Sequence, residues 1–151
     1  MDRHPVEATG LVSPEAFEQV MQQATRQMLH DVIHAVNQAP DGQWINGSEM
    51  QVRDLLGEYR RRVFEAALQI KTEAAEGAFP PTDPSTGQRL KKKGTGDRST
   101  LTANGRVSLR RRRWQHRGGG AVVPVDPLLD RAEATVSRGT RQLCCRLNGT
   151  K

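Results

Sequence analysis

The sequence contains few aromatic residues and little apolar surface. Six of its 151 residues are Phe, Trp or Tyr, and the hydrophobic fraction is 35%. No stretch approaches the roughly 18 consecutive apolar residues of a membrane helix, and the first residues lack the charged-then-apolar pattern of a secretory signal. This composition argues against a large single core, a membrane partner and export. We expect a cytoplasmic protein with at most one modest domain.

Residues that commonly carry catalysis or bind metals are also scarce. Cys144 and Cys145 are adjacent, which strains an intrachain disulfide and matches no metal-site spacing, and we expect one of them to pack as a small apolar residue. His30 and His34 are four residues apart, but the intervening glutamate of a helical zinc motif is missing. No cysteine lies near His116 and no carboxylate follows it closely, so we expect it to be exposed. The sequence predicts no enzyme active site, no cofactor and no metal in this chain.

Charge is distributed unevenly along the chain. The formal net charge is +6 and the sequence pI is about 10.0. Residues 1–76 contain 7 Lys/Arg against 12 Asp/Glu, whereas residues 77–151 contain 16 against 5. The two halves therefore have different tasks, and the second half has the charge expected for binding a polyanion.

Residues 13–77 follow the pattern of two helices. Residues 1–12 lack periodicity and are expected to be a disordered leader. Ser13-Pro14 is a helix start, Pro40 ends that helix, and Ser48 with Gln51 suggests a capping box for the next one. The apolar stripes are Val20, Met21, Ala24, Met28, Val32 and Ala35 in the first helix, and Val52, Leu55, Leu56, Tyr59, Val63, Ala67 and Ile70 in the second. We expect an antiparallel helical hairpin, with Arg60, Arg61 and Arg62 mostly on its wet side. Because so thin a hairpin buries little surface, a homodimer through it is a secondary hypothesis.

Residues 78–124 contain shorter sequence patterns than the two helices. Residues 78–99 are rich in Pro, Gly and Lys and are expected to form a linker or basic arm. Residues 100–124 contain Asn104-Gly105 between two strand-like segments and predict a basic β-hairpin region. A three-residue loop would pair Leu101 with Val107, and a two-residue loop would place Leu101 opposite Ser108; we expect the former, because register follows the buried face.

A short helix starting after Ser137 is expected within residues 125–151, and Asp126 and Asp130 are expected to cap turns near Pro127. We interpret residues 125–151 as the start of a downstream domain that is truncated. The predicted fold class is α+β: a long antiparallel helical hairpin, a small basic β-hairpin region and a short C-terminal helix, joined by a flexible linker.

The strongest chemical feature is the basic segment 88–117, with 11 Lys/Arg and the single acid Asp97. Alternation along a strand places Arg110 and Arg112 on one face and Arg111 and Arg113 on the other, so we expect the hairpin to present guanidinium groups on both sides. Trp114 either stacks on a base or packs beneath the arginines. The predicted nucleic-acid-binding residues are Lys91, Lys92, Lys93, Arg98, Arg106, Arg110, Arg111, Arg112, Arg113, Trp114 and Arg117.

Three segments of this half resemble the ISKra-type insertion-sequence transposases, bacterial enzymes of the DDE class. They are a T-x-x-G-x-V hairpin that continues into an arginine-rich strand (100–114), a P-x-D-x-L segment (123–130) and a serine-started helix (136–143). The resemblance covers about half of the chain and only the front part of a family member. It implies a DNA-binding amino-terminal fragment of a transposase that acts on insertion-sequence ends in DNA recombination, near the bacterial nucleoid.

The sequence departs from the family in two respects. Family members often have Cys-x-x-Cys pairs before and after the basic strand, where zinc would staple the hairpin, but residues 83–87 and 116–120 contain no cysteine. The family's catalytic carboxylates lie beyond the last residue here, so the resemblance assigns no catalytic role to this chain. The alternative interpretation is a stand-alone basic interaction protein that binds RNA, or a protein partner through its helical hairpin.

Overall fold

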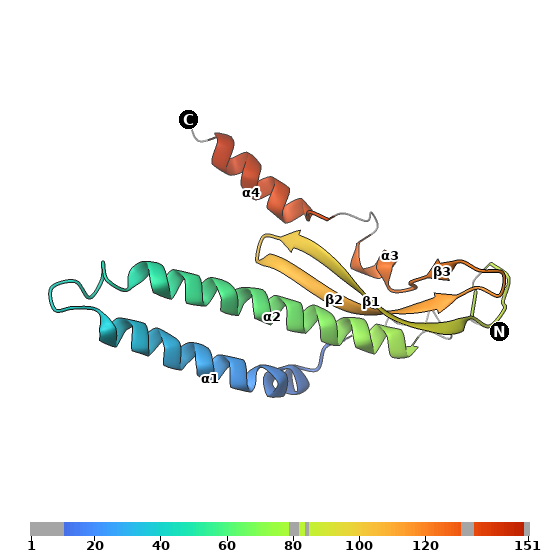
Figure 1. The fold of residues 1–151 in the computed structure, drawn as a ribbon, viewed down its shortest axis with the longest axis horizontal. Helices are drawn as coiled ribbons and strands as arrows, with labels where there is room; N and C mark the ends of the chain where they lie inside the picture. The colour runs from blue at the N-terminus through green and yellow to red at the C-terminus, as the bar shows by residue number, and fades with distance from the viewer. Residues whose placement is uncertain (1–10, 79–81, 84, 131–134, 150–151) are drawn as a thin grey trace.

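The computed structural model describes residues 11–78, 82–83, 85–130 and 135–149, so residues 1–10 of the expected leader lie outside this part. The chain is α+β, as predicted, with two long helices followed by a small antiparallel sheet and a C-terminal helix (Figure 1). The elements are α1 (Pro14–Gln38), α2 (Glu49–Ala78), β1 (Lys91–Thr102), β2 (Gly105–Gln115), β3 (Ala121–Val122), α3 (Asp126–Leu129) and α4 (Arg138–Gly149).

Both long helices begin close to the predicted residues, but one predicted cap is wrong. The Ser13 hydroxyl accepts a hydrogen bond from the Ala16 amide at 3.4 Å, which satisfies a free donor of the first turn of α1. The Ser48 hydroxyl instead donates to the Trp44 carbonyl oxygen at 2.5 Å. Its side chain is therefore engaged with the connector between the helices, and the capping box with Gln51 does not form.

The two helices pack as an antiparallel hairpin with a thin interface. Met21 and Ala35 are buried, and the Thr25 and Tyr59 hydroxyls lie 2.8 Å apart across the interface. The predicted stripes are too wide, because Val20 is 58% exposed and Leu56 is 44% exposed. A single neighbouring helix covers only a narrow stripe, so the margins of both apolar faces stay in solvent.

The β-hairpin is longer than predicted. β1 begins at Lys91 and pairs with β2 as far as Gln115, so residues 91–99 form a strand and not the expected linker. The register shifts between Lys92 and Gly94, and Gly94 has φ +97°, a conformation that glycine adopts without strain. A bulge at this glycine thus lets a Gly- and Lys-rich segment remain in the sheet.

Neither register considered from the sequence is the observed one. Thr102 pairs with Gly105, which leaves a two-residue loop, and Leu101 lies opposite Arg106. Val107 pairs with Thr100 and is 2% exposed. The predicted Leu101–Val107 pairing failed because it assumed that Leu101 shares the buried face, whereas Leu101 lies on the opposite one.

The C-terminal elements complete the sheet region. β3 pairs with the end of β2, and Val136 forms a parallel bridge with Leu101 on the outer edge of β1. The Ser137 hydroxyl accepts from the Thr140 amide at 3.2 Å, so the predicted cap of α4 is present, and the Thr140 hydroxyl donates to the Leu101 carbonyl oxygen at 3.0 Å. Beyond this anchor α4 is exposed, including Cys144 and Cys145, so the expected packing of one cysteine is wrong.

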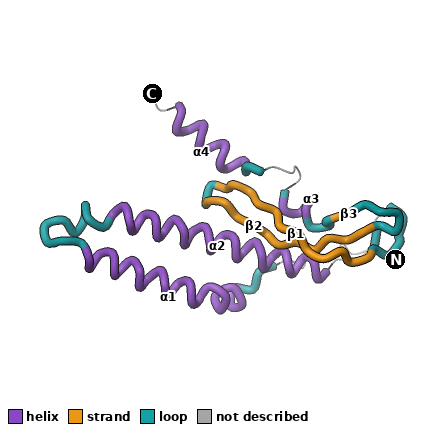
Figure 2. The backbone as a smooth tube through the Cα atoms, in the orientation of Figure 1, coloured by secondary structure: helices purple, strands orange, loops and turns teal. Residues whose placement is uncertain are grey.

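α2 is the central element of the molecule. It contacts α1 on one side and β2 on the other (Figures 1 and 2). Thr72 and Glu76, two polar residues near its end, are buried on the side of the sheet, where the Thr72 hydroxyl donates to the Leu68 carbonyl oxygen at 2.7 Å. The end of α2 therefore turns polar side chains toward β2, whereas Phe64 and Leu68 line the inside of the sheet region. The core of the sheet region consists of Leu90, Val107, Leu109 and Val125.

Candidate nucleic-acid interface

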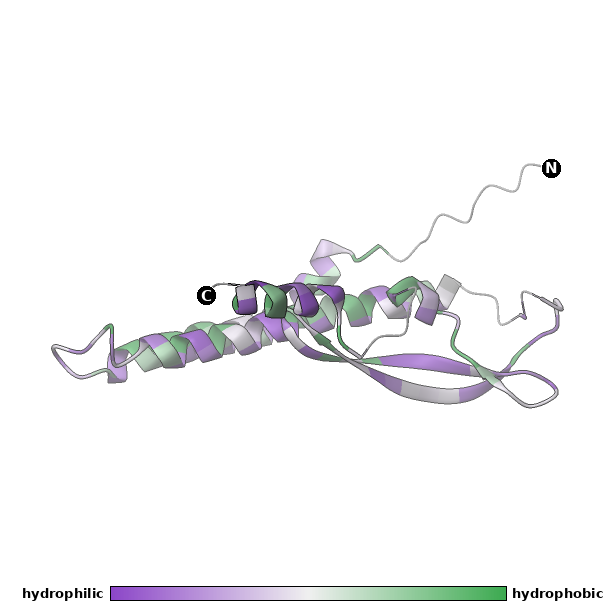
Figure 3. Cartoon of the chain, turned by 90° about the horizontal axis from the view of Figure 1, so that it is seen from above, coloured by the Kyte–Doolittle hydropathy of each residue, from purple (hydrophilic) through white to green (hydrophobic). Residues whose placement is uncertain are grey.

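The two faces of the β-hairpin differ in their surroundings. Val107 and Leu109 point inward, toward an open cavity of about 390 Å³ that is also lined by Phe64 and Leu68 of α2 and Leu129 of α3. Residues 106, 108, 110 and 112 alternate with these positions and are exposed. We call these the inner face and the outer face. In Figure 3 the strands carry long hydrophilic stretches.

Two predicted nucleic-acid-binding residues lie on the inner face. The side chains of Arg98 and Arg111 are 10% and 12% exposed, and both approach the Asp126 carboxylate of α3. Arg111 donates a hydrogen bond to Asp126, and the nearest Arg98 nitrogen lies 3.8 Å from the same oxygen. Because Arg98 and Arg111 are nearly buried and share one carboxylate, we assign them a structural role. They are not accessible to nucleic acid on the surface. Asp126 is an ion-pair acceptor and not the turn cap that we expected.

The outer face carries the exposed arginines. Arg106, Arg110 and Arg112 occupy alternate positions of β2, so their side chains project from the same side of the strand. The only acid among residues 88–117, Asp97, lies opposite Arg110, with their nearest charged atoms 4.0 Å apart and both side chains about 70% exposed. A pair this exposed and this long is weak, so it leaves the guanidinium group of Arg110 accessible.

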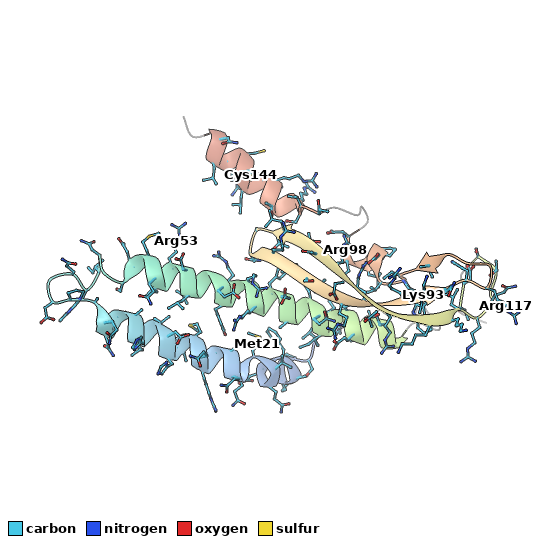
Figure 4. The ribbon with its side chains drawn as sticks, viewed as in Figure 1. Met21, Arg53, Lys93, Arg98, Arg117 and Cys144 are labelled. Atoms are coloured by element: carbon cyan, nitrogen blue, oxygen red, sulfur yellow. The ribbon has the colours of Figure 1, made fainter. Side chains whose placement is uncertain are left out.

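The end of the hairpin far from its turn adds further cations. Lys91, Lys92, Lys93 and Arg117 are exposed there, and Figure 4 shows Lys93 and Arg117 near the same end of the sheet. Trp114 is half-buried, in register with Lys92 on one side and with Val122 of β3 on the other.

Arg113 is half-buried on the inner side of the strand. A Cβ atom at Gly96 would lie 2.8 Å from the Cδ of Arg113, so the arginine stem crosses β1 where there is no side chain. The expected display of guanidinium groups on both faces is therefore wrong. Arg111 is enclosed and Arg113 lies along the sheet, while the outer face presents an exposed row of arginines.

A polar stripe of α2 occupies the open edge of β2. The Gln69 amide accepts from the Arg110 amide at 2.8 Å and donates to the Arg110 carbonyl oxygen at 3.0 Å. Glu65 accepts from the Ser108 amide at 2.9 Å. Glu76 accepts from the Arg112 amide, and Arg61 donates to the Arg106 carbonyl oxygen at 3.4 Å. The helix thus supplies hydrogen bonds that a neighbouring strand supplies in a sheet.

The hydrogen bonds between α2 and β2 repeat because the residue spacings along the helix and along the strand match. Four helical residues rise about 6 Å, and two strand residues advance about 6.6 Å. Arg61, Glu65 and Gln69 are spaced by four residues, and their partners Arg106, Ser108 and Arg110 are spaced by two. Each step along the helix therefore meets the next outward-pointing peptide group of β2. This stripe was missed in the sequence, although the repeat of long polar side chains at 61, 65 and 69 was its signal.

Arg61 is consequently not a free surface cation. It bonds Glu58 at 2.8 Å and Glu65 at 3.0 Å, and its stem lies against Gly105. The hydrogen bond from Arg61, together with one from Arg62, holds the pKa of Glu58 at about 2, and the same bond raises the pKa of Arg61. Arg61 and Arg62 are thus partly neutralised by neighbouring acids, whereas Arg110 of the outer face has only its long contact with Asp97.

His116 has a carboxylate partner that comes from upstream in the chain. Its Nδ1 lies 3.0 Å from the Asp83 carboxylate, and its side chain is 39% exposed. The residues next to His116 in the sequence give no sign of this partner, because the fold brings Asp83 to it from 33 positions upstream. His30 and His34 stack on each other on α1, with ring centroids 6.4 Å apart.

Neither metal-ligand geometry in the described residues nor similarity to known proteins assigns a function to this surface. No group of three or more His, Cys, Asp or Glu side chains is placed to hold a metal ion in the described part of the chain, and no helix there is long and apolar enough to cross a bilayer. No protein-family model matches the chain, and neither curated proteins nor solved structures give a significant match.

Proposed function

We propose that the protein binds DNA through the outer face of its β-hairpin. The observation that carries this proposal is the exposed row of Arg106, Arg110 and Arg112, flanked by Lys91–Lys93 and Arg117 and opposed by the single acid Asp97. The other side of the hairpin is occupied by α2 and α3, so one basic surface faces solvent.

Guanidinium groups on alternate strand positions suit the phosphate backbone. Each can contact phosphate oxygens bidentately, and each neutralised phosphate releases condensed counterions. Such contacts set position and affinity but do not read bases. The resemblance to ISKra-type transposases supports insertion-sequence ends as the DNA to test, and in this proposal the chain is an end-binding module.

A salt series tests the electrostatic contribution. Affinity for a duplex should fall steeply as salt rises, and Arg106→Ala, Arg110→Ala and Arg112→Ala together should reduce the slope of log K against log salt by about 3, or about 0.9 per phosphate contact. The matched control is Arg26→Ala, Arg53→Ala and Arg60→Ala, which removes three exposed arginines from the helices. Binding that ignores salt, or equal loss in both variants, contradicts the proposal.

A second comparison tests the DNA target. The purified chain should prefer the terminal DNA of its own element to an unrelated duplex of equal length, and the triple hairpin variant should lose this preference. Equal binding to both duplexes would reduce the proposal to a general nucleic-acid-binding protein.

A second candidate function is docking of a protein partner or a second copy through the helical hairpin. It is favoured by exposed apolar side chains at and near the free end of that hairpin. They are Leu29, Ile33, Val36, Trp44, Ile45, Met50 and Leu56. Of these, Leu29, Ile33 and Val36 are spaced i, i+4 and i+7 and so form a continuous apolar stripe on one exposed face of α1. Sedimentation of the wild type against Leu29→Ser with Ile33→Ser tests it, because a dimer formed here should dissociate in the variant.

A further inference from the structure

Two turns that are distant in the sequence meet at the open end of the β-hairpin. In the first, the Asp83 amide donates to the Gln88 carbonyl oxygen and the Gly87 amide donates to the Asp83 carbonyl oxygen, both at 2.7 Å. A bridge between Thr82 and Arg89 closes this turn immediately before β1. Backbone hydrogen bonds between described residues of this turn therefore lie at the entrance to the hairpin.

The second turn follows β2. The His116 amide donates to the Gly120 carbonyl oxygen at 3.0 Å, and the Gly119 amide donates to the His116 carbonyl oxygen at 3.1 Å. Its first residue reaches the first turn, since His116 Nδ1 lies 3.0 Å from Asp83 Oδ2. The hairpin is therefore connected at both ends, by the peptide loop at 103–104 and by this side-chain pair.

The Asp83 carboxylate is held in place for this contact. Its other oxygen accepts from the Ser85 amide at 2.8 Å and from the Ser85 hydroxyl at 2.7 Å, and the residue is only 8% exposed. These bonds, with a smaller contribution from His116, keep the pKa of Asp83 at about 2. One oxygen is thus fixed by its own turn, and the other is free to bind the imidazole.

The donor set at this junction does not fit zinc. A structural zinc site uses four ligands, mostly thiolate sulfur and imidazole nitrogen. Residues 83 and 85–87 together with 116–120 supply one carboxylate, one imidazole and the hydroxyls of Ser85 and Thr86. The zinc staple of the family members, which was not expected in this chain, has no counterpart among these side chains.

We propose that Asp83 and His116 form a metal-independent clamp that fixes the basic end of the hairpin. β1 starts two residues after Arg89 and β2 ends at the residue before His116, so the clamp holds both strand ends in register. Charged groups on the joined elements are Arg89, Lys91 and Arg117, with Glu76 at the end of α2. The effect of the clamp on affinity, through Lys91–Lys93 and Arg117, rests on the proposed function; the clamp itself does not.

Hydrogen exchange followed by mass spectrometry tests the clamp without nucleic acid. His116→Ala should speed exchange at Lys91–Lys93 and Gln115 about tenfold, the change expected for losing a charge-assisted hydrogen bond. Exchange near Thr102 and Gly105 should not change. The matched control, His34→Ala, removes an exposed histidine from α1 and should leave all these amides unaltered.

Two further experiments distinguish loss of the Asp83–His116 contact from a general loss of folding and from loss of a bound metal. His116→Asn, whose side-chain amide can donate to the Asp83 carboxylate while the Ser85 bonds stay in place, should recover most of the protection at the strand ends. EDTA or added Zn²⁺ should leave the wild-type exchange unchanged. Unaltered exchange in His116→Ala, no recovery in His116→Asn, or loss of protection in EDTA would each overturn the clamp. If these experiments succeed while DNA binding fails, only the proposed function is lost.

Discussion

Arg110 and Arg111 are neighbours in one strand, yet their surroundings are opposite. Arg110 is 73% exposed with one loose carboxylate contact, whereas Arg111 is 12% exposed and bonded to Asp126. The same contrast separates the outer and inner faces along β2. The arginines of this run therefore do not act as one unit. Successive side chains of a strand point to opposite faces, so alternate arginines point inward and the others point to solvent. The inner arginines should control stability and the outer ones should control binding.

The largest effect should come from removing the shared carboxylate of the inner face. Asp126→Ala leaves Arg98 and Arg111 together in the interior without a counter-charge, which we expect to destabilise the fold by about 3–5 kcal/mol. Urea unfolding followed by circular dichroism measures this loss. Asp130→Ala, at an exposed position just beyond α3, is the control and should change stability by less than about 0.5 kcal/mol. Equal effects would mean that the inner ion pairs do not stabilise the sheet region.

The neighbouring arginines offer the sharpest test of the comparison. Arg111→Ala should lower the free energy of unfolding by about 1–3 kcal/mol, because the carboxylate of Asp126 loses its bonded partner but keeps Arg98 nearby. Arg110→Ala should stay within about 0.5 kcal/mol of the wild type.

Binding should show the reverse order. Arg110→Ala should reduce the salt slope by about 1, and Arg111→Ala should leave that slope unchanged under conditions where it is folded. The division between faces would be wrong if Arg111 altered the salt dependence as much as Arg110.

A smaller effect is expected at the edge of β2. Gln69→Ala removes a donor and an acceptor from the Arg110 peptide, which water can partly replace, so we expect a loss of about 1 kcal/mol. Arg60→Ala, on an exposed position of the same helix, controls for changes in helix propensity. Hydrogen exchange at Ser108–Arg112 should rise in the first variant only; a rise in both would assign the effect to α2 as a whole.

The smallest effect should appear on acidification. The pKa values of Glu58 and Asp83 are both lowered to about 2, from ordinary values of 4.5 and 3.8. Lowered values mean that the stabilisation is present above about pH 4.5 and is lost as the pH falls toward 2. Glu58→Gln should flatten this dependence in part, as measured by the urea midpoint between pH 5 and pH 2.5. A midpoint that falls equally in the variant would exclude Glu58 as a source.

Several features could be predicted from local sequence. Ser13-Pro14 gave the start of α1, Asn104-Gly105 indicated the hairpin, and Ser137 predicted the cap of α4, because each depends on hydrogen bonds within a few residues. The segment 91–99 was misinterpreted as a linker because its glycines and lysines have low strand propensity. Pairing with a long β2 overrides that preference.

The amino-acid sequence alone determined the helical hairpin, the concentration of cations after residue 77 and the alternation of arginines along β2. Only the tertiary structure decided which face of that alternation is buried, that α2 completes the open edge of the sheet, and that Asp83 reaches His116. The reason is physical. Helix caps and strand alternation follow from neighbouring residues, whereas burial and ion pairing depend on groups that lie tens of positions apart and meet only when the layers pack.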